Sequence, residues 1–255
     1  MRTNQAEEAF HLDGLTKHFG DFTAVDQVGL SIPVGSFFGL VGPNGAGKTT
    51  LLSMAVGLIR PDSGTSAVHG HDLWQAPKEA KAALGVLLEG DMLPRRLTGA
   101  ELLTYVGLLR GMKSAEVADR SAEVLRALDL VSAADVVVAD YSTGMRKKIA
   151  LAAALLHGPS VLVLDEPFEA VDPVSAATIR SILTGYVARG GTVVFSSHVM
   201  ALVELLCDRV AVLDAGRVVA HGTLDEVRGG GSLEDAFAHL VGAQPTAETL
   251  SWFRF

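Results

Sequence analysis

The chain has 255 residues, of which 49% are hydrophobic, so it can bury a sizeable core as one large domain and is not an intrinsically disordered chain. Its formal net charge is -8, without a basic run or interleaved aromatic and basic residues, which argues against nucleic acid as the main partner. The single cysteine, Cys207, excludes an internal disulfide framework and a cysteine-rich metal site, and its apolar neighbours indicate a packing role.

The first eight residues are polar and acidic and have no apolar signal-peptide core behind them, so we expect the chain in the cytoplasm. The most apolar stretch, Ile149–Leu164, is too short for a membrane span and is interrupted at residues 157–160. A buried helix followed by a buried strand explains this stretch better. If a membrane is involved, another polypeptide must cross it.

Strand patterns and helix patterns alternate along the chain. Residues 9–32 alternate apolar and polar side chains around a turn at 19–21, which predicts an antiparallel β unit. Four continuous apolar runs, typical of strands buried on both faces, follow at 37–41, 85–88, 160–164 and 192–195. Because helical patterns separate these runs, we predict an α/β fold with a mainly parallel sheet. The segment 209–220, with a turn at 214–216, predicts a β-hairpin.

A helical lobe is inserted into this α/β pattern. Helical periodicity replaces strands over about 91–157, in the segments 99–109, 114–128 and 145–156. We therefore divide the chain into a main domain over 1–242, with core segments at about 9–90 and 158–228 and the helical subdomain at about 91–157, and a short C-terminal tail over 229–255. In that tail, three glycines predict a flexible joint before a helix capped by Ser232.

The strongest chemical signal is a phosphate-loop pattern that directly follows the strand ending at Val41. Its glycines allow backbone N–H groups to converge on phosphate oxygens, and the next helix presents its positive end. Lys48 is placed to reach the β- and γ-phosphates, and the Thr49 hydroxyl is placed to bind Mg²⁺. The pattern therefore predicts a site for ATP and Mg²⁺. The loop residues are Gly42, Pro43, Asn44, Gly45, Ala46, Gly47, Lys48, Thr49 and Thr50.

Three further elements fit phosphate chemistry. Asp165 and Glu166 follow a strand, where Asp165 can hold Mg²⁺ through water and Glu166 can polarise the water that attacks the γ-phosphate. His198 lies at the carboxyl end of another strand, where such sheets bind ligands, and is a candidate γ-phosphate contact. Ser142 and Gly144, at the start of a helix, form either a second anion site or a simple helix cap.

The order of these motifs resembles the nucleotide-binding subunits of ABC transporters, particularly the branch serving drug-export and related ABC-2 type permeases. The resemblance covers about residues 10–242 and implies a P-loop NTPase (RecA-like) core, an antiparallel N-terminal β subdomain and an inserted α-helical subdomain. It also implies that the ring of Phe19 stacks on adenine, with burial in an edge strand as the alternative. The matching motifs are Walker A at Gly42–Thr50, Walker B at Val161–Glu166, the signature at Tyr141–Met145, the D-loop at Glu169–Asp172 and the switch histidine His198.

Two residues depart from the family pattern. Glu89 occupies the Q-loop position, where most members have a glutamine that contacts Mg²⁺ and the attacking water. Its carboxylate can still bind the metal but, when ionised, cannot donate a hydrogen bond. Thr143 replaces the first signature glycine, while Ser142 and Gly144 match and Met145 follows. We expect both departures to affect turnover more than ATP binding.

The resemblance implies a head-to-tail dimer, either homodimer or heterodimer, in which residues 142–145 of one subunit contact ATP held by the other. It also implies transmembrane permease subunits as partners, a peripheral location at the inner face of the membrane, and export as the direction of transport expected in this branch. The permease is expected at a groove near Glu89–Leu97, where residues 92–94 form either a docking surface or a plain buried loop. The sequence does not encode the cargo.

Two other functions stay open. One is a soluble ABC-type ATPase acting in translation or DNA repair, against which the single domain and the acidic balance count. The other is a regulatory subunit that binds ATP but barely hydrolyses it. Glu166 and His198 count against that reading, whereas Glu89 and Thr143 keep it alive.

Overall fold

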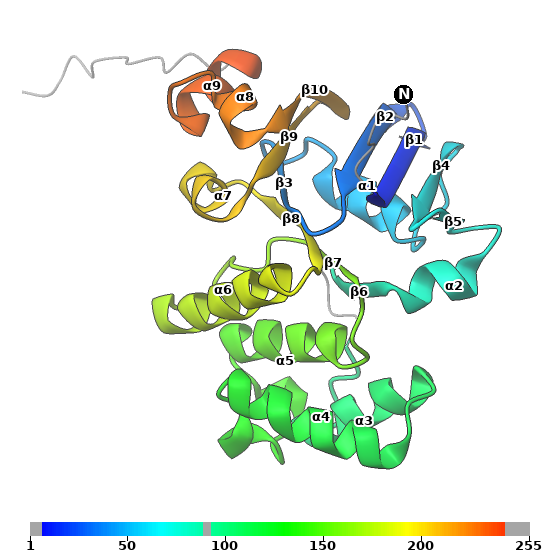
Figure 1. Ribbon diagram of the computed structural model, residues 1–255, viewed down its shortest axis with the longest axis vertical. Helices are drawn as coiled ribbons and strands as arrows, with labels where there is room; N and C mark the ends of the chain where they lie inside the picture. The colour runs from blue at the N-terminus through cyan, green and yellow to red at the C-terminus, as the bar shows by residue number, and fades with distance from the viewer. Residues whose placement is uncertain (1–6, 89–92, 243–255) are drawn as a thin grey trace, which may run out of the picture.

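The computed structural model describes residues 7–88 and 93–242. At its centre is a six-stranded sheet with the order β10-β9-β3-β8-β7-β6 (Figure 1). The five strands from β9 to β6 run parallel and β10 pairs antiparallel with β9, so the predicted mainly parallel sheet is confirmed. The strands are β3 (Phe37–Val41), β6 (Leu84–Leu87), β7 (Val161–Leu164), β8 (Thr192–Ser197), β9 (Arg209–Asp214) and β10 (Arg217–Thr223).

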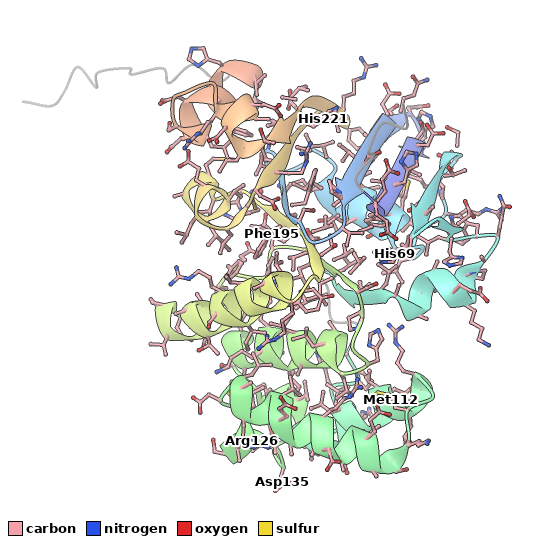
Figure 2. All side chains as sticks on the ribbon, in the orientation of Figure 1. His69, Met112, Arg126, Asp135, Phe195 and His221 are labelled. Carbon is pink, nitrogen blue, oxygen red and sulfur yellow. The ribbon has the colours of Figure 1, made fainter. Side chains whose placement is uncertain are left out.

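Both faces of this sheet are buried, which explains the continuous apolar runs. Along β3, Phe37 and Val41 belong to one hydrophobic core, and Phe38 and Leu40 to the core on the opposite face. Figure 2 shows Phe195 of β8 near the middle of the molecule, where its ring packs edge-to-face with Phe37 at 5.6 Å between centroids. The central strands are therefore fixed by packing on two sides.

The N-terminal segment forms a separate antiparallel sheet with the order β2-β1-β4-β5. Helix α1 (Lys48–Ala55) packs between the two sheets, since Leu51 shares a core with Leu15 of β1 and Leu40 of β3. The predicted antiparallel unit is confirmed, whereas β4, β5 and α2 were not predicted. The elements are β1 (Glu8–Phe19), β2 (Phe22–Pro33), β4 (Ser63–Val68), β5 (His71–Asp72) and α2 (Pro77–Ala82).

Three helices form the lower end of the molecule as drawn in Figure 1. They are α3 (Gly99–Leu109), α4 (Ser114–Ala127) and α5 (Thr143–Leu155), with short 3₁₀ turns at Val131–Ala133 and Val138–Asp140. A capping box of Thr98 and Glu101 starts α3. Buried leucines of α3 and α4 join Ile149 of α5 in one core. The helical patterns over 99–156 are thus observed as helices.

The helices of the C-terminal part pack against one face of the core sheet, where α6 (Pro173–Ala188) and α7 (Met200–Leu206) share a core with β3 and β8. Its other elements are the β9–β10 hairpin, α8 (Leu224–Arg228) and α9 (Leu233–Leu240). The predicted hairpin is confirmed, with positive φ at both Ala215 and Gly216 in its turn. The predicted cap is also confirmed, because the Ser232 hydroxyl accepts the N–H of Asp235 at 3.1 Å. Cys207 is buried, as its apolar neighbours predicted.

The helix after the glycine joint docks onto the core. Leu233 is fully buried, and its N–H donates to Glu204 of α7 at 2.5 Å. Within residues 7–88 and 93–242, no helix combines the length and the apolar character needed to cross a membrane.

Candidate active site

The glycine-rich loop connects β3 to α1 and adopts a conformation that requires glycine. Gly45 and Gly47 have φ values of 81° and 101°, in the left-handed region. A Cβ on Gly42 would lie 2.3 Å from the carbonyl oxygen of Leu213, so this turn also passes very close to β9. A Cβ on Gly47 would lie 2.3 Å from the carbonyl oxygen of Ala24 in β2, so the loop is held against both β9 and β2, with the N-terminus of α1 directly behind it.

Lys48 is folded back over this loop. Its side chain is 8% exposed, and Nζ donates to the carbonyl oxygens of Gly42 at 2.8 Å and Pro43 at 3.2 Å. The same ammonium lies 3.9 Å from the Glu166 carboxylate. A buried cation that is fixed by backbone carbonyls and faces a carboxylate is well placed to attract phosphate oxygens.

Asp165 is completely buried at the end of β7, yet both carboxylate oxygens have partners. Oδ2 accepts the Thr49 hydroxyl at 2.7 Å, and Oδ1 accepts the Ser196 hydroxyl from the end of β8. These contacts tie the loop to two strand ends. Sequence reasoning did not single out Ser196, although its position before the predicted switch histidine gave a signal.

Glu166 lies next to Asp165 with an unusual backbone, since its φ is 44°. Its N–H donates to Ser196 Oγ at 2.9 Å, and its carboxylate lies 3.0 Å from Nδ1 of His198. The structure thus brings together Lys48, Thr49, Asp165, Glu166 and His198, which come from three separate segments of the sequence. The arrangement can hold a polyphosphate chain beside a carboxylate that accepts a proton.

Of these residues, Lys48, Thr49, Glu166 and His198 line a hollow of about 450 Å³. Phe22, at the start of β2, also lines it, and the sequence analysis missed this residue. The signal was the tight hairpin, in which Phe19 and Phe22 are directly opposite and therefore share one face. The alternative that Phe19 is buried in an edge strand is wrong, because 51% of Phe19 is exposed.

The predicted signature lies at the N-terminus of α5. The Ser142 hydroxyl caps α5 by accepting the N–H of Met145 at 3.2 Å, so the capping role is confirmed. Thr143 Oγ1 accepts a hydrogen bond from Arg146. In the part of the chain that the structure describes, residues 142–145 do not line the hollow. Contact of these residues with a partner's nucleotide stays a prediction.

Asp172, in the predicted D-loop, caps α6 by accepting the N–H groups of Ser175 and Val174. The hydrogen bonds from Ser175 and the N–H of Val174 hold the pKa of this carboxyl below its usual range. Glu89 and Met92 lie outside the described residues, so the predicted Q-loop contacts are not placed. Among residues 7–88 and 93–242, no group of three or more His, Cys, Asp or Glu side chains could hold a metal ion.

A parallel strand, a glycine-rich loop, a helix and an acidic pair at the end of a second parallel strand define a P-loop nucleotide-binding protein. Comparison with protein families narrows this class. The ABC transporter family matches residues 25–169, which is more than half of the chain, and the chain belongs to this family.

Several curated relatives support the same assignment. The daunorubicin/doxorubicin resistance ATP-binding protein DrrA of Streptomyces peucetius is 37% identical over 88% of this chain and 68% of its own length. The linearmycin resistance ATP-binding protein LnrL of Bacillus subtilis is 37% identical over 83% and 68%. The Nod factor export ATP-binding protein I of Cupriavidus metallidurans is 38% identical over 83% and 70%.

Solved structures agree on the fold. The ATP-binding subunit of an ABC transporter has a TM-score of 0.85 at 28% identity and covers 91% of this chain and 99% of its own. An ATP-binding cassette in a dimeric post-hydrolysis state, bound to ADP and Pi, has a TM-score of 0.77 at 25% identity, with 84% and 98% covered. The chain is therefore an ATP-binding subunit of the ABC transporter family with an ABC-type ATPase domain. A role in translation or DNA repair is not supported.

Proposed function

We propose that this chain hydrolyses Mg-ATP in a head-to-tail dimer and drives export through separate transmembrane permease subunits. The observation that supports this proposal most directly is the cluster of Lys48, Glu166 and His198 in the wall of the hollow. Beside it, the Thr49 hydroxyl donates a hydrogen bond to the buried Asp165. Lys48 would hold the β- and γ-phosphates, and Glu166 would accept the proton of the attacking water. His198 would contact the γ-phosphate and orient Glu166.

The residues around Asp165 fit Mg²⁺. They offer oxygen atoms, from the Thr49 hydroxyl and a carboxylate that is completely buried and therefore needs compensating partners. Mg²⁺ usually keeps several waters and takes only one or two protein ligands beside the phosphates. When bound, it would neutralise charge on the phosphates. Thr49 would bind it directly, Asp165 through water, and Glu89 is a further candidate from the family pattern.

Adenine binding is supported by the exposed aromatic pair at the hairpin. The family resemblance assigns stacking to Phe19, and Phe22 lies on the same face and lines the hollow. In the dimer, Ser142, Thr143, Gly144 and Met145 would contact ATP held by the other subunit.

A groove of about 510 Å³ supports the permease partner. It runs between β6 and the helical lobe and is largely apolar, with Leu87, Val106 and Ala150 among its lining residues. Leu88 and Leu93, on either side of the predicted Q-loop, also line it. A permease bound there would hold this chain at the inner face of the membrane. We also propose that the chain is divided as the family resemblance implies, into a core at about 9–90 and 158–228, a helical subdomain at about 91–157 and a short tail.

Export is supported by the relatives, since their names describe resistance to daunorubicin, doxorubicin and linearmycin and export of Nod factor. The cargo itself is set by the permease. Copurification with the permease followed by mass spectrometry identifies that partner and distinguishes a homodimer from a heterodimer of ATPase subunits.

The test is phosphate release from Mg-ATP by the wild type, Lys48→Ala and Glu166→Gln, with the exposed Lys78→Ala as control. We expect Lys48→Ala to lose ATP binding or turnover, and Glu166→Gln to bind ATP and accumulate as a dimer during size-exclusion chromatography. Unchanged hydrolysis in both variants would overturn these assignments. A wild type that binds ATP but turns over only after co-expression with a second ATPase would favour the regulatory subunit.

A further inference from the structure

The backbone of Glu166 is held in a conformation that it does not prefer. Its φ of 44° lies in the left-handed region, which is uncommon for residues other than glycine, asparagine and aspartate. The next residue is Pro167, and a residue before proline normally adopts an extended conformation. Such a conformation persists only where the surrounding contacts fix it. The contacts of Glu166 therefore determine where its carboxylate points.

Three groups of Glu166 are fixed from different directions. The N–H donates to Ser196 Oγ at 2.9 Å, and the carboxylate lies 3.0 Å from His198 Nδ1. Both of these partners come from the end of β8. The carbonyl oxygen accepts hydrogen bonds from Nζ of Lys147 at 2.8 Å and from the N–H of Glu169 at 3.2 Å, and Lys147 comes from α5 in the helical lobe. A charged donor forms a stronger hydrogen bond than a neutral one.

Lys147 also lies at the boundary between two cavities. It lines the groove together with Glu169 and Ala170, while Glu166 and Glu169 line the nucleotide hollow. The segment 166–170 is thus the wall that separates the groove from the hollow. It contains a second left-handed residue, Ala170, with φ of 53°. A change in the position of α5 moves a donor attached to this wall.

We propose that Lys147 is a positioning residue for Glu166. Its ammonium fixes the Glu166 carbonyl, so the carboxylate stays beside His198 and Lys48, and the orientation of Glu166 depends on the position of the helical lobe. This inference rests on the proposed role of Glu166 as the group that accepts the proton of the attacking water. Lys147 does not line the hollow, so for nucleotide held by the same subunit it acts through Glu166 and not through direct contact.

The experiment compares Lys147→Met, which keeps the length and apolar part of the side chain, with Lys147→Arg, which retains a donor. The exposed Lys113, at the start of α4, gives the matched control Lys113→Met. Steady-state ATP hydrolysis and thermal unfolding are measured for each purified full-length protein. We expect Lys147→Met to lower kcat by about tenfold with KM for ATP unchanged within about twofold. Lys147→Arg should recover most of the loss, and the melting temperature should stay unchanged.

Two results would overturn the proposal. One is a kcat for Lys147→Met equal to that of Lys113→Met. The other is a loss that Lys147→Arg shares fully or that accompanies an equal rise in KM or a lowered melting temperature, since these indicate a merely structural role. Glu166→Gln in the same series distinguishes a failure of the Lys147 proposal alone from a failure of the proposed role of Glu166. If Glu166→Gln hydrolyses ATP at the wild-type rate, the proposed role of Glu166 fails, and the Lys147 proposal fails with it.

Discussion

Two glycines of the phosphate loop give a matched pair for testing how the loop is held. Both Gly45 and Gly47 have positive φ, so alanine at either position has a strained backbone, which costs about 1–2 kcal/mol. They differ in surroundings. A Cβ on Gly45 meets no atom within 4 Å, whereas a Cβ on Gly47 lies 2.3 Å from the carbonyl oxygen of Ala24. Ala24 belongs to β2, so that oxygen cannot move without disturbing the antiparallel sheet.

The expected effects follow from this difference. Gly45→Ala should lower the free energy of unfolding by about 1 kcal/mol, because fewer unfolded conformations offset part of the strain. Gly47→Ala adds an overpacking cost of about 1–3 kcal/mol and should destabilise the protein by about 3 kcal/mol in total. Equilibrium urea unfolding without nucleotide measures both values. Equal destabilisation by the two substitutions, or a larger effect at Gly45, would refute the claim that contact with β2 restrains the loop.

Two further predictions concern the base site and the joint between lobe and core. Phe22→Ala should weaken ATP binding at least as much as Phe19→Ala does, by about tenfold, because a stacking contact with the base is lost. Binding of tripolyphosphate, which has no base, should stay unchanged. Calorimetry that shows weaker ATP binding for Phe19→Ala alone would assign the base to Phe19. Burial and the charge of Arg110 lower the pKa of His157 to about 4, whereas its value in the unfolded chain is near 6.5. The folded state therefore gains stability from neutral His157, which is fully present above pH 6.5 and is lost as the pH falls to about 4. After allowance for partial exposure, we expect this pH-dependent part of the free energy of unfolding to be about 2 kcal/mol and His157→Gln to abolish it. Urea unfolding at a series of pH values measures it, and the same pH profile in wild type and His157→Gln would contradict the lowered pKa.

Local sequence patterns predicted much of the fold and the polar cluster for physical reasons. Continuous apolar runs report burial on both sheet faces, so β3, β7 and β8 were found within a few residues. The carboxyl ends of parallel strands meet at one edge, so Asp165, Glu166 and His198 could be expected to lie near the phosphate loop. Weak patterns failed. The strand β4, Ser63–Val68, is short and mostly polar, and its place was decided by pairing with β1.

Contacts between distant segments could not be predicted in the same way. The approach of Lys147 to the Glu166 carbonyl depends on how α5 packs against the core, and no local pattern encodes that distance. The left-handed backbone of Glu166 is equally invisible, because glutamate normally avoids it. Phe22 was missed for a different reason: the family pattern drew attention to Phe19, while the hairpin register places both rings on one face.

The first turns of α5 combine two tasks on one helical face. Thr143, Lys147, Ala150 and Ala154 all line the groove, with the three- and four-residue spacing of a single face. On that face, Thr143 accepts a hydrogen bond from Arg146, and Lys147 donates to Glu166. A helix that fills the groove must therefore press on the same side chains that fix the signature turn and the Glu166 carbonyl. Because Glu166 is held in a disfavoured backbone by a few contacts, we expect a displacement of this face to change the direction of its carboxylate.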